Sequence, residues 1–396
     1  MGDTGSVDGA AVEGAAATPD ASAARPEESR RDPVQTQADL QAWLVETLPE
    51  GSEPEITEFT VPDSNGMSSE TVLLEATWTT DGRREAHPLV ARIAPLDSAV
   101  PVFETYDLDS QFKTMAKVRE LTGVPVPETH WLEEGDEAIG SPFFVMSRAY
   151  GVVPPDVMPY PFGDNWLFDA SLEDQRRLEA ATVDVLVELH GIEDPEQHFD
   201  FLVDADDGDE RSPLRRHVDA TRSYLEWVTN DGVQVPLLER AFEWLEANWP
   251  EDEPPSALSW GDARIGNAMY DDFEPVAVLD WEMASIAPRE VDLAWMIYIH
   301  RFFQDVAAVF ELEGMPHFMH RDQIVAMYEE RAGYTPRDMD FHTLYAAVRY
   351  GVVAVQVKKR GIAFGMDEMP EDPDDMLMNR QALEEMLDGT YWDRVL

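Results

Sequence analysis

The chain has 396 residues, of which 44% are hydrophobic and 10% aromatic, so it can form about two domains and bury a substantial core. Its 80 acidic residues against 29 lysines and arginines give a formal net charge of −51 at pH 7. This charge argues against nucleic acid and anionic membranes as partners, because both would be repelled. The absence of cysteine excludes disulfides, thiolate metal sites and cysteine nucleophiles. No apolar run reaches the ~20 residues of a membrane span and no secretory signal opens the chain, so we expect a cytoplasmic protein.

The chain begins with an acidic, alanine-rich segment, residues 1–36, that lacks aromatic residues. Such a segment buries too little apolar surface to offset the entropy of ordering, which predicts a disordered tail. Residues 37–147 are rich in short β-type runs separated by turn residues, with helices expected at 37–48 and 108–121. This pattern predicts a small lobe, residues 37–147, built on an antiparallel sheet.

Residues 148–396 show mainly helical periodicity. A helix at 171–192 opens at Ser171, with Asp174 three residues on, which is close to a capping box. Further helices are expected at 214–229, 236–249, 289–311, 321–333 and 340–359. We therefore predict an α+β fold in which a small antiparallel-sheet N-terminal lobe and a larger, mainly helical C-terminal lobe enclose a cleft.

One hairpin stands out within the helical part, where "NAMY" and "VAVLD" flank "DDFEP". Pairing Tyr270 with Ala277 places Asn267 opposite Asp280, with the two side chains about 5 Å apart on one face. Asp262 lies five residues before Asn267 in a glycine-containing loop. An amide oxygen and a carboxylate suit a hard cation such as Mg²⁺. The alternative is that these are ordinary turn-forming residues at a solvated hairpin end.

The segments "WGDARIGNAMY" (260–270) and "VLDWE" (278–282) resemble the catalytic segment of the aminoglycoside phosphotransferase and choline kinase-like superfamily. That segment usually reads H-G-D-x-x-x-x-N, followed by a strand ending in D-W or D-x-E. The variant with Trp260 in place of His is similar to phosphotransferase-like proteins related to acyl-CoA dehydrogenase family 10, and "REVDLAW" (289–295) matches the acidic segment that follows. The resemblance implies a protein kinase-like two-lobed fold. It also implies Mg-ATP-dependent transfer of the γ-phosphate to a hydroxyl of a small molecule.

The resemblance also implies roles for single residues of this segment. Asp262 would orient or deprotonate the acceptor hydroxyl, while Asn267 and Asp280 would hold Mg²⁺ on the ATP phosphates. Arg264 would bridge to phosphate or to an acid of the substrate, or else form a salt bridge with one of the many acids nearby. Asp292 is expected to be a buried structural acid rather than a catalyst, and His190 in "LVELHG" is expected to serve packing and capping.

Residues of the small lobe match the nucleotide-binding parts of the same superfamily. "GMSSETV" (66–72) resembles its phosphate loop, which implies phosphate binding at Ser68 and Ser69, although glycine and serine turns are common elsewhere. Arg92 in "LVARIAP" stands where the superfamily carries a phosphate-binding lysine. Its usual glutamate partner on the next helix is replaced by Gln111, which allows at best a hydrogen bond with a neutral acceptor.

The segment "FFVMSRAYG" resembles the linker between the two lobes. Met146 would be the gatekeeper behind adenine, with the Ser147 carbonyl and the Ala149 N–H bonded to its edge, although a methionine after such a run is also ordinary core. Trp260 fills the place of the usual supporting His and can donate one hydrogen bond but accept none. Trp260, Arg92 and Gln111 keep open a second interpretation, a catalytically weak or inactive nucleotide-binding regulatory protein of the same fold.

The acidity has two explanations, a cationic ligand or adaptation to high salt, where screening suppresses self-repulsion. The acids are spread along the whole chain rather than gathered in a few segments, which favours the second explanation. We therefore expect the free energy of unfolding to rise as KCl is increased from low to molar concentration, measured by urea titration at each salt concentration. A free energy that stays level or falls would contradict the high-salt explanation.

Overall fold

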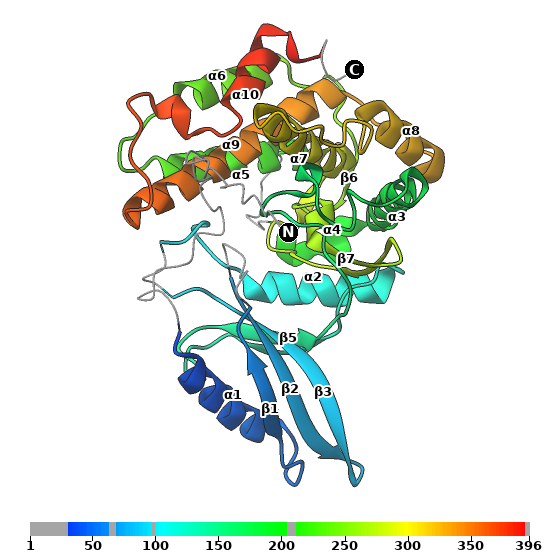
Figure 1. Cartoon of the computed structure of the whole chain (residues 1–396), viewed down its shortest axis with the longest axis vertical. Helices are drawn as coiled ribbons and strands as arrows, with labels where there is room; N and C mark the ends of the chain where they lie inside the picture. Colours follow the sequence, from blue (N-terminus) through cyan, green and yellow to red (C-terminus); the bar gives the residue numbers. More distant parts are fainter. Residues whose placement is uncertain (1–30, 63–68, 97–99, 204–210, 393–396) are drawn as a thin grey trace, which may run out of the picture.

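The computed structural model describes residues 31–62, 69–96, 100–203 and 211–392. A sheet lobe lies at one end and a larger helical lobe at the other (Figure 1). The sheet is antiparallel, with strand order β1-β2-β3-β5-β4. Its strands are β1 (Glu55–Thr60), β2 (Glu70–Thr80), β3 (Arg83–Ile93), β4 (Thr129–Glu133) and β5 (Phe143–Ser147). The α+β fold with an antiparallel sheet lobe followed by a helical lobe is confirmed.

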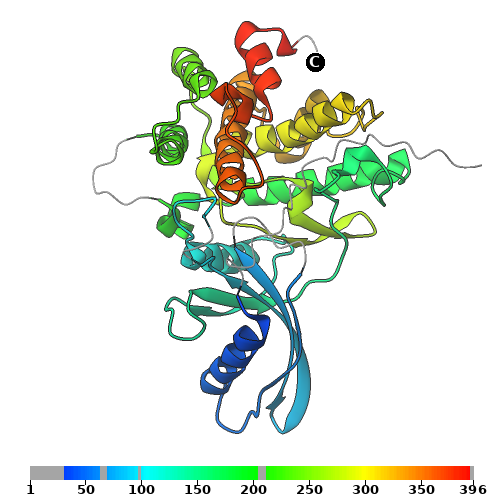
Figure 2. The ribbon, with the colours of Figure 1, turned by 60° about the vertical axis from the view of Figure 1, so that its left-hand side comes forward.

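The two faces of the sheet are covered by different parts of the chain. Alternate residues of β2, including Val72 and Leu74, are buried against Leu40 and Leu44 of α1 (Pro33–Thr47). The other face meets α2 (Leu108–Leu121), which lies between the sheet and the helical lobe in both views (Figures 1 and 2). The period-2 burial of β2 follows from side chains that alternate between the two faces of a strand.

The first helix begins earlier than the sequence predicted. Residues 33–36, assigned to the tail, are the first turn of α1, because the Asp32 side chain accepts hydrogen bonds from the backbone N–H groups of Val34 and Gln35. Pro33 sits at the first helical position, where its missing N–H costs nothing. The tail boundary at 36 was therefore wrong, and residues 1–30 lie outside the described part of the chain.

The helical lobe is built around two helices that are buried on most sides, α7 (Arg289–Val309) and α9 (Met339–Ala363). They pack against each other, and the remaining helices surround them (Figure 1). These are α3 (Leu172–His190), α4 (Pro195–His198), α5 (Pro213–Val228), α6 (Pro236–Ala247), α8 (Arg321–Ala332) and α10 (Arg380–Asp388). Within the described ranges, no helix combines the length and apolar character needed to cross a bilayer.

Two short strand pairs are inserted before α7. β6 (Ser256–Ser259) pairs with β9 (Ser285–Pro288), and β7 (Ala268–Asp271) pairs with β8 (Glu274–Val278). Short 3₁₀ turns complete the lobe at Tyr160–Phe162, Asp200–Leu202, Ile265–Asn267 and Pro373–Met376. The first pair was not predicted, because its partners are four residues long and more than 20 residues apart in the sequence.

The β7–β8 hairpin was predicted, but its register is one residue away from the predicted one at Ala268 and two residues away at Tyr270. Ala268 pairs with Val278, and the ladder is irregular before Tyr270, which pairs with Pro275. The turn is tighter than expected because Asp272 and Phe273 both adopt positive φ, as a two-residue turn of this hand requires. Pro275 lacks an N–H for the ladder, which accounts for the irregularity. Asn267 and Asp280 are therefore not a cross-strand pair.

The packing of α3 can be tested by a matched pair of substitutions. Leu186 is fully buried, whereas Leu172 on the same helix is 56% exposed. Leu186→Ala should lower the free energy of unfolding by about 2–5 kcal/mol, and Leu172→Ala should change it by no more than about 0.5 kcal/mol. Urea denaturation followed by far-UV circular dichroism measures both, and equal effects would contradict the packing described for α3.

Candidate active site

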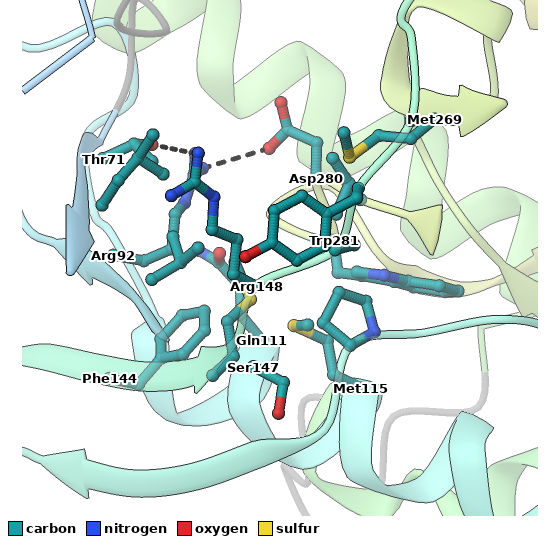
Figure 3. A pocket seen from close by; sticks show the side chains of 18 residues that line it. Thr71, Arg92, Gln111, Met115, Phe144, Ser147, Arg148, Met269, Asp280 and Trp281 are labelled. Carbon is teal, nitrogen blue, oxygen red and sulfur yellow. Dashed lines mark hydrogen bonds and ion pairs between the residues drawn. The ribbon is translucent and has the colours of Figure 1, made fainter. Parts of the chain in front are cut away.

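A pocket of ≈ 320 Å³ opens between the two lobes (Figure 3). Its walls come from β2, β3, α2 and β5, from the segment that joins β5 to the helical lobe, and from the hairpin segment at 269–281. The residues that line it include Thr71, Arg92, Gln111, Met146, Ser147, Ala149 and Asp280. The sheet lobe therefore supplies most of this pocket, and the hairpin closes it from the opposite side.

One end of the pocket holds an ion pair between the lobes. The Arg92 guanidinium donates from Nη1 to Thr71 Oγ1 at 3.0 Å and lies 3.4 Å from Asp280 Oδ1 through Nη2 (Figure 3). Burial raises the pKa of Asp280, Arg92 opposes this, and Asp262 adds to it, so that the pKa lies above its ordinary value. Asp280, the second residue after β8, also adopts φ +61, so its side chain does not follow the alternation of the strand.

Gln111 was expected to be the helix partner of Arg92. It is buried in α2 and lines the pocket, but among the described residues no hydrogen bond joins its side chain to Arg92. Thr71 and Asp280 hold the guanidinium instead. The pairing of Arg92 with Gln111 that the sequence suggested is therefore replaced by contacts with Thr71 and Asp280.

The other end of the pocket is formed by the segment leading out of β5. Met146, Ser147 and Ala149 all line it, as the sequence predicted for an adenine site. The backbone here is fixed to its neighbours, because Ser147 N donates to Glu128 O at 2.8 Å. The predicted phosphate loop is less visible: Ser68 lies outside the described residues. The Ser69 side chain is fully buried at the start of β2 and does not line the pocket.

Asp262 lies in the loop between β6 and β7, where three donors hold its carboxylate. Trp295 Nε1 donates to Oδ1 at 2.6 Å, while Asn267 Nδ2 at 2.6 Å and Arg264 Nε at 3.1 Å donate to Oδ2. The loop bends at Gly261, which has φ +89 and packs so closely on Met283 O that a Cβ atom would lie 2.0 Å away. Only glycine fits at that position, so the "GD" pair of the motif follows from space as well as from backbone conformation.

Arg264 is held between two acids. Besides the Asp262 contact, its Nη1 lies 2.5 Å from Asp156 Oδ2, in the segment that follows the lobe linker. Burial lowers the pKa of Arg264, but the two carboxylates raise it more, so the pKa lies above its ordinary value. Of the alternatives left open by the sequence, the structure therefore shows Arg264 in salt bridges with acids of the chain.

The loop is fastened from behind by Asp292 on α7. This fully buried carboxylate accepts from Trp260 N at 2.7 Å and Gly261 N at 3.0 Å, and it also bonds Ser259 Oγ and His190 Nε2. Burial raises the pKa of Asp292, but these hydrogen bonds outweigh it, so the pKa lies below its ordinary value. Asp292 is buried and structural, as predicted. His190 is buried in the core, as predicted, but its ring bonds Tyr328 and Asp292 rather than capping α3.

By the motif, Trp260 occupies the position of the usual His, and it supports the loop through a different hydrogen bond. Its ring is 1% exposed, and its Nε1 donates to Leu279 O at 2.8 Å. Leu279 immediately precedes Asp280, so Trp260 joins the Asp262 loop to the segment that carries the second acid. The expectation that Trp260 fills the space and donates one hydrogen bond is confirmed.

Three residues of the site were missed. Trp295 could have been found, because it lies one helical turn after Asp292 in "REVDLAW" and therefore on the same face of α7. Asp156 and Arg349 carry no local signal. Arg349 on α9 donates from Nη2 to Gly261 O at 3.0 Å and lies over the Trp295 ring, 4.5 Å from its centroid.

The oxygen donors near the pocket suit a hard cation that brings further ligands with it. Within the described ranges, no three or more His, Cys, Asp or Glu side chains are grouped to hold a metal. Asn267 donates from Nδ2 to both the backbone and the carboxylate of Asp262, which directs its amide oxygen away from those acceptors. That oxygen and the Asp280 carboxylate are the ligand types that Mg²⁺ takes alongside phosphate oxygens and water.

Solved structures share the fold of this chain. A candidate aminoglycoside phosphotransferase from Ralstonia eutropha JMP134 superimposes with a TM-score of 0.60 at 18% identity, covering 90% of this chain and 98% of that one. A thermostable mutant of the aminoglycoside phosphotransferase APH(4)-Ia, solved with AMP-PNP and hygromycin B, gives a TM-score of 0.50 at 14% identity over 88% and 98%. At these identities the likeness shows the fold, which is the kinase-like two-lobed fold that the sequence predicted.

A curated relative from the mouse, acyl-CoA dehydrogenase family member 10, is 26% identical over 292 residues. The match takes in 69% of this chain but only 24% of the mouse protein, so the chain spans about a quarter of that relative. A family model described as the phosphotransferase enzyme family matches residues 60–352, well over half of the chain. The chain therefore belongs to the phosphotransferase enzyme family.

Proposed function

We propose that this member of the family is a Mg-ATP-dependent phosphotransferase that moves the γ-phosphate to a hydroxyl of a small molecule. The observation that carries the proposal is the Asp262 carboxylate. Three donors hold it in a fixed position at the end of a loop whose neighbouring segment carries Asp280. A carboxylate positioned in this way can orient a hydroxyl and receive its proton.

The pocket supports a nucleotide with its base at one end and its phosphates at the other. Adenine would lie by Met146, with the Ser147 carbonyl and the Ala149 N–H at its edge, and the phosphates would point to Arg92. The ternary complex of APH(4)-Ia contains AMP-PNP, which agrees with a nucleotide in this fold. Ser68 and Ser69 remain proposed contacts of the phosphate loop.

Asn267 and Asp280 would hold Mg²⁺ on the phosphates. When bound, the ion would offset negative charge on the phosphate oxygens, which matters in a chain with a net charge of −51. Arg92 now pairs with Asp280, so a nucleotide that attracts the guanidinium would free this carboxylate for the ion. Asn267 and Asp280 would then supply two oxygen ligands, and phosphate oxygens and water would supply the others.

The transfer itself requires little covalent chemistry from the protein. The acceptor oxygen would bond to the γ-phosphorus, the bond from that phosphorus to the bridging oxygen would break, and its electron pair would leave with ADP. The hydroxyl proton would pass to Asp262. Arg264 lies two residues after Asp262. Its guanidinium, which now contacts Asp156, could instead bind the transferred phosphate. Positioning and charge stabilisation then account for catalysis.

A second candidate is a nucleotide-binding regulatory protein with weak or no activity. The observation that favours it is the Arg92–Asp280 ion pair. In this pair, the residue proposed to bind phosphate is bonded to the residue proposed to bind Mg²⁺. Gln111 offers Arg92 no alternative partner among the described residues. Thermal-shift titration with ATP, with and without Mg²⁺, combined with ADP release over a broad panel of hydroxyl acceptors, separates the two functions. Binding without turnover on any acceptor, water included, would favour the regulator.

The role of Asp262 can be tested against an exposed acid of the same region. Asp262→Ala should lower kcat for ADP release at least about 100-fold, because it removes the proton acceptor. The ATP-induced thermal shift should remain. Asp271→Ala, on the exposed end of β7, is the control and should keep wild-type kcat. Retained turnover in Asp262→Ala would contradict the proposed function.

The role of Arg92 has a control on the same strand. Arg92→Met should raise KM for ATP by about 10- to 100-fold, since a hydrogen bond to a charged group is worth about 1.5–3 kcal/mol. Arg84→Met removes an exposed cation from the far end of β3 and should leave KM unchanged. Steady-state kinetics of ADP release measure both, and equal KM values in the two variants would show that Arg92 does not bind the phosphates.

A further inference from the structure

We infer that the acceptor hydroxyl binds to Oδ1 of Asp262 rather than to Oδ2, and that Trp295 is the positioning residue that fixes this choice. The inference rests on the proposed function and adds to it the face of the carboxylate on which the acceptor lies. It follows from the unequal hydrogen bonding of the two oxygens. Trp295 of α7 thereby gains a positioning role that the sequence motif alone did not indicate.

An ionised carboxylate has four lone-pair sites, two on each oxygen. On Oδ2 both are taken, by Asn267 Nδ2 at 2.6 Å and Arg264 Nε at 3.1 Å. On Oδ1 the described residues supply a single donor, Trp295 Nε1 at 2.6 Å. One site on Oδ1 is therefore left for a hydroxyl, and the Asp262 side chain as a whole is 17% exposed.

The donors on Oδ2 are not easily displaced. Asn267 is held twice, since its Nδ2 also donates to the Asp262 backbone carbonyl at 3.0 Å. Arg264 is held by Asp156 as well as by Asp262. A hydroxyl arriving at Oδ2 would have to break one of these contacts, whereas one arriving at Oδ1 breaks none. Binding of the hydroxyl at Oδ1 is therefore favoured over binding at Oδ2 by the free energy of at least one hydrogen bond to a charged group.

Trp295 can determine this geometry because it is itself fixed. Its side chain is 4% exposed, and the Arg349 guanidinium lies over its ring at 4.5 Å. Arg349 also donates to the carbonyl of Gly261, the residue before Asp262. Arg349 therefore fixes the position of the indole N–H relative to the Asp262 loop. Loss of the N–H would leave Oδ1 with two open sites, so a hydroxyl would no longer be confined to one of them.

The test replaces the N–H while keeping an aromatic ring beneath Arg349. Mg-ATP hydrolysis, with water as the acceptor, is measured for wild type, Trp295→Phe and the control Trp244→Phe, which alters a half-buried tryptophan of α6. We expect kcat of Trp295→Phe to fall about 10- to 100-fold through loss of acceptor orientation. KM for ATP and the ATP-induced thermal shift should stay at wild-type values, and the control should keep both constants.

The outcomes separate the inference from the proposed function. No ATP hydrolysis by wild type, and no ADP release with any acceptor, would overturn the function itself. Hydrolysis by wild type with an unchanged kcat in Trp295→Phe would overturn only the inference, and so would a rise in KM with kcat preserved. If Trp295→Phe fails to fold, Arg349→Met decides in its place, because it removes the cation that fixes the indole. A wild-type kcat in that variant also overturns the inference.

Discussion

The geometry of the site depends on one buried carboxylate, that of Asp292, which has no exposed surface. It accepts hydrogen bonds from the backbone N–H groups of Trp260 and Gly261, and it also bonds the side chains of Ser259 and His190. These bonds compensate its charge in the interior. A buried charge left without such donors costs several kcal/mol. The loop is therefore held by the need to satisfy this carboxylate, not by its own turn preferences. Because Asp292 and Trp295 lie one turn apart on α7, the same helix fixes the backbone of the loop and the carboxylate at its end.

A second constraint joins the lobes, and it depends on charge rather than on packing. The Arg92–Asp280 contact at 3.4 Å connects β3 with the hairpin segment across the pocket, where both side chains remain partly exposed. An ion pair of this kind is worth little in water and more as solvent is excluded. It therefore holds the lobes loosely without a ligand. Phosphates would compete for the guanidinium and a cation for the carboxylate, so this contact lies where the proposed substrates would bind.

Local patterns predicted most of the fold, and long-range contacts account for what they missed. The bounds of α2 were predicted to the residue, and α3 to within two residues, because helical periodicity and the Ser171 cap are local signals. The hairpin register failed at Pro275 and at the positive φ of Asp272 and Phe273, which only the folded turn reveals. Asp262, Asp280 and Asn267 were singled out from their motif, whereas Asp156, which pairs with Arg264, was not. Arg349 was not, since its contact with Gly261 joins residues 88 apart, and no sequence pattern records such a pairing.

By the resemblance of the sequence to the superfamily, Arg92 stands where lysine is usual and Gln111 where glutamate is usual, and the contacts of Arg92 fit this pair of differences. An ammonium group is a point charge on a flexible stem and is commonly held by an opposite charge, whereas a guanidinium is a planar fork whose nitrogens bond separate partners. Arg92 uses this property, with Nη1 on Thr71 and Nη2 toward Asp280. Thr71 of the neighbouring strand and Asp280 of the opposite lobe thus orient the guanidinium, so no acidic residue is needed on α2. A buried glutamate at position 111 would instead need a partner that Arg92, already engaged twice, supplies less well. Gln111, 4% exposed and uncharged, fits this wall of the pocket without that cost.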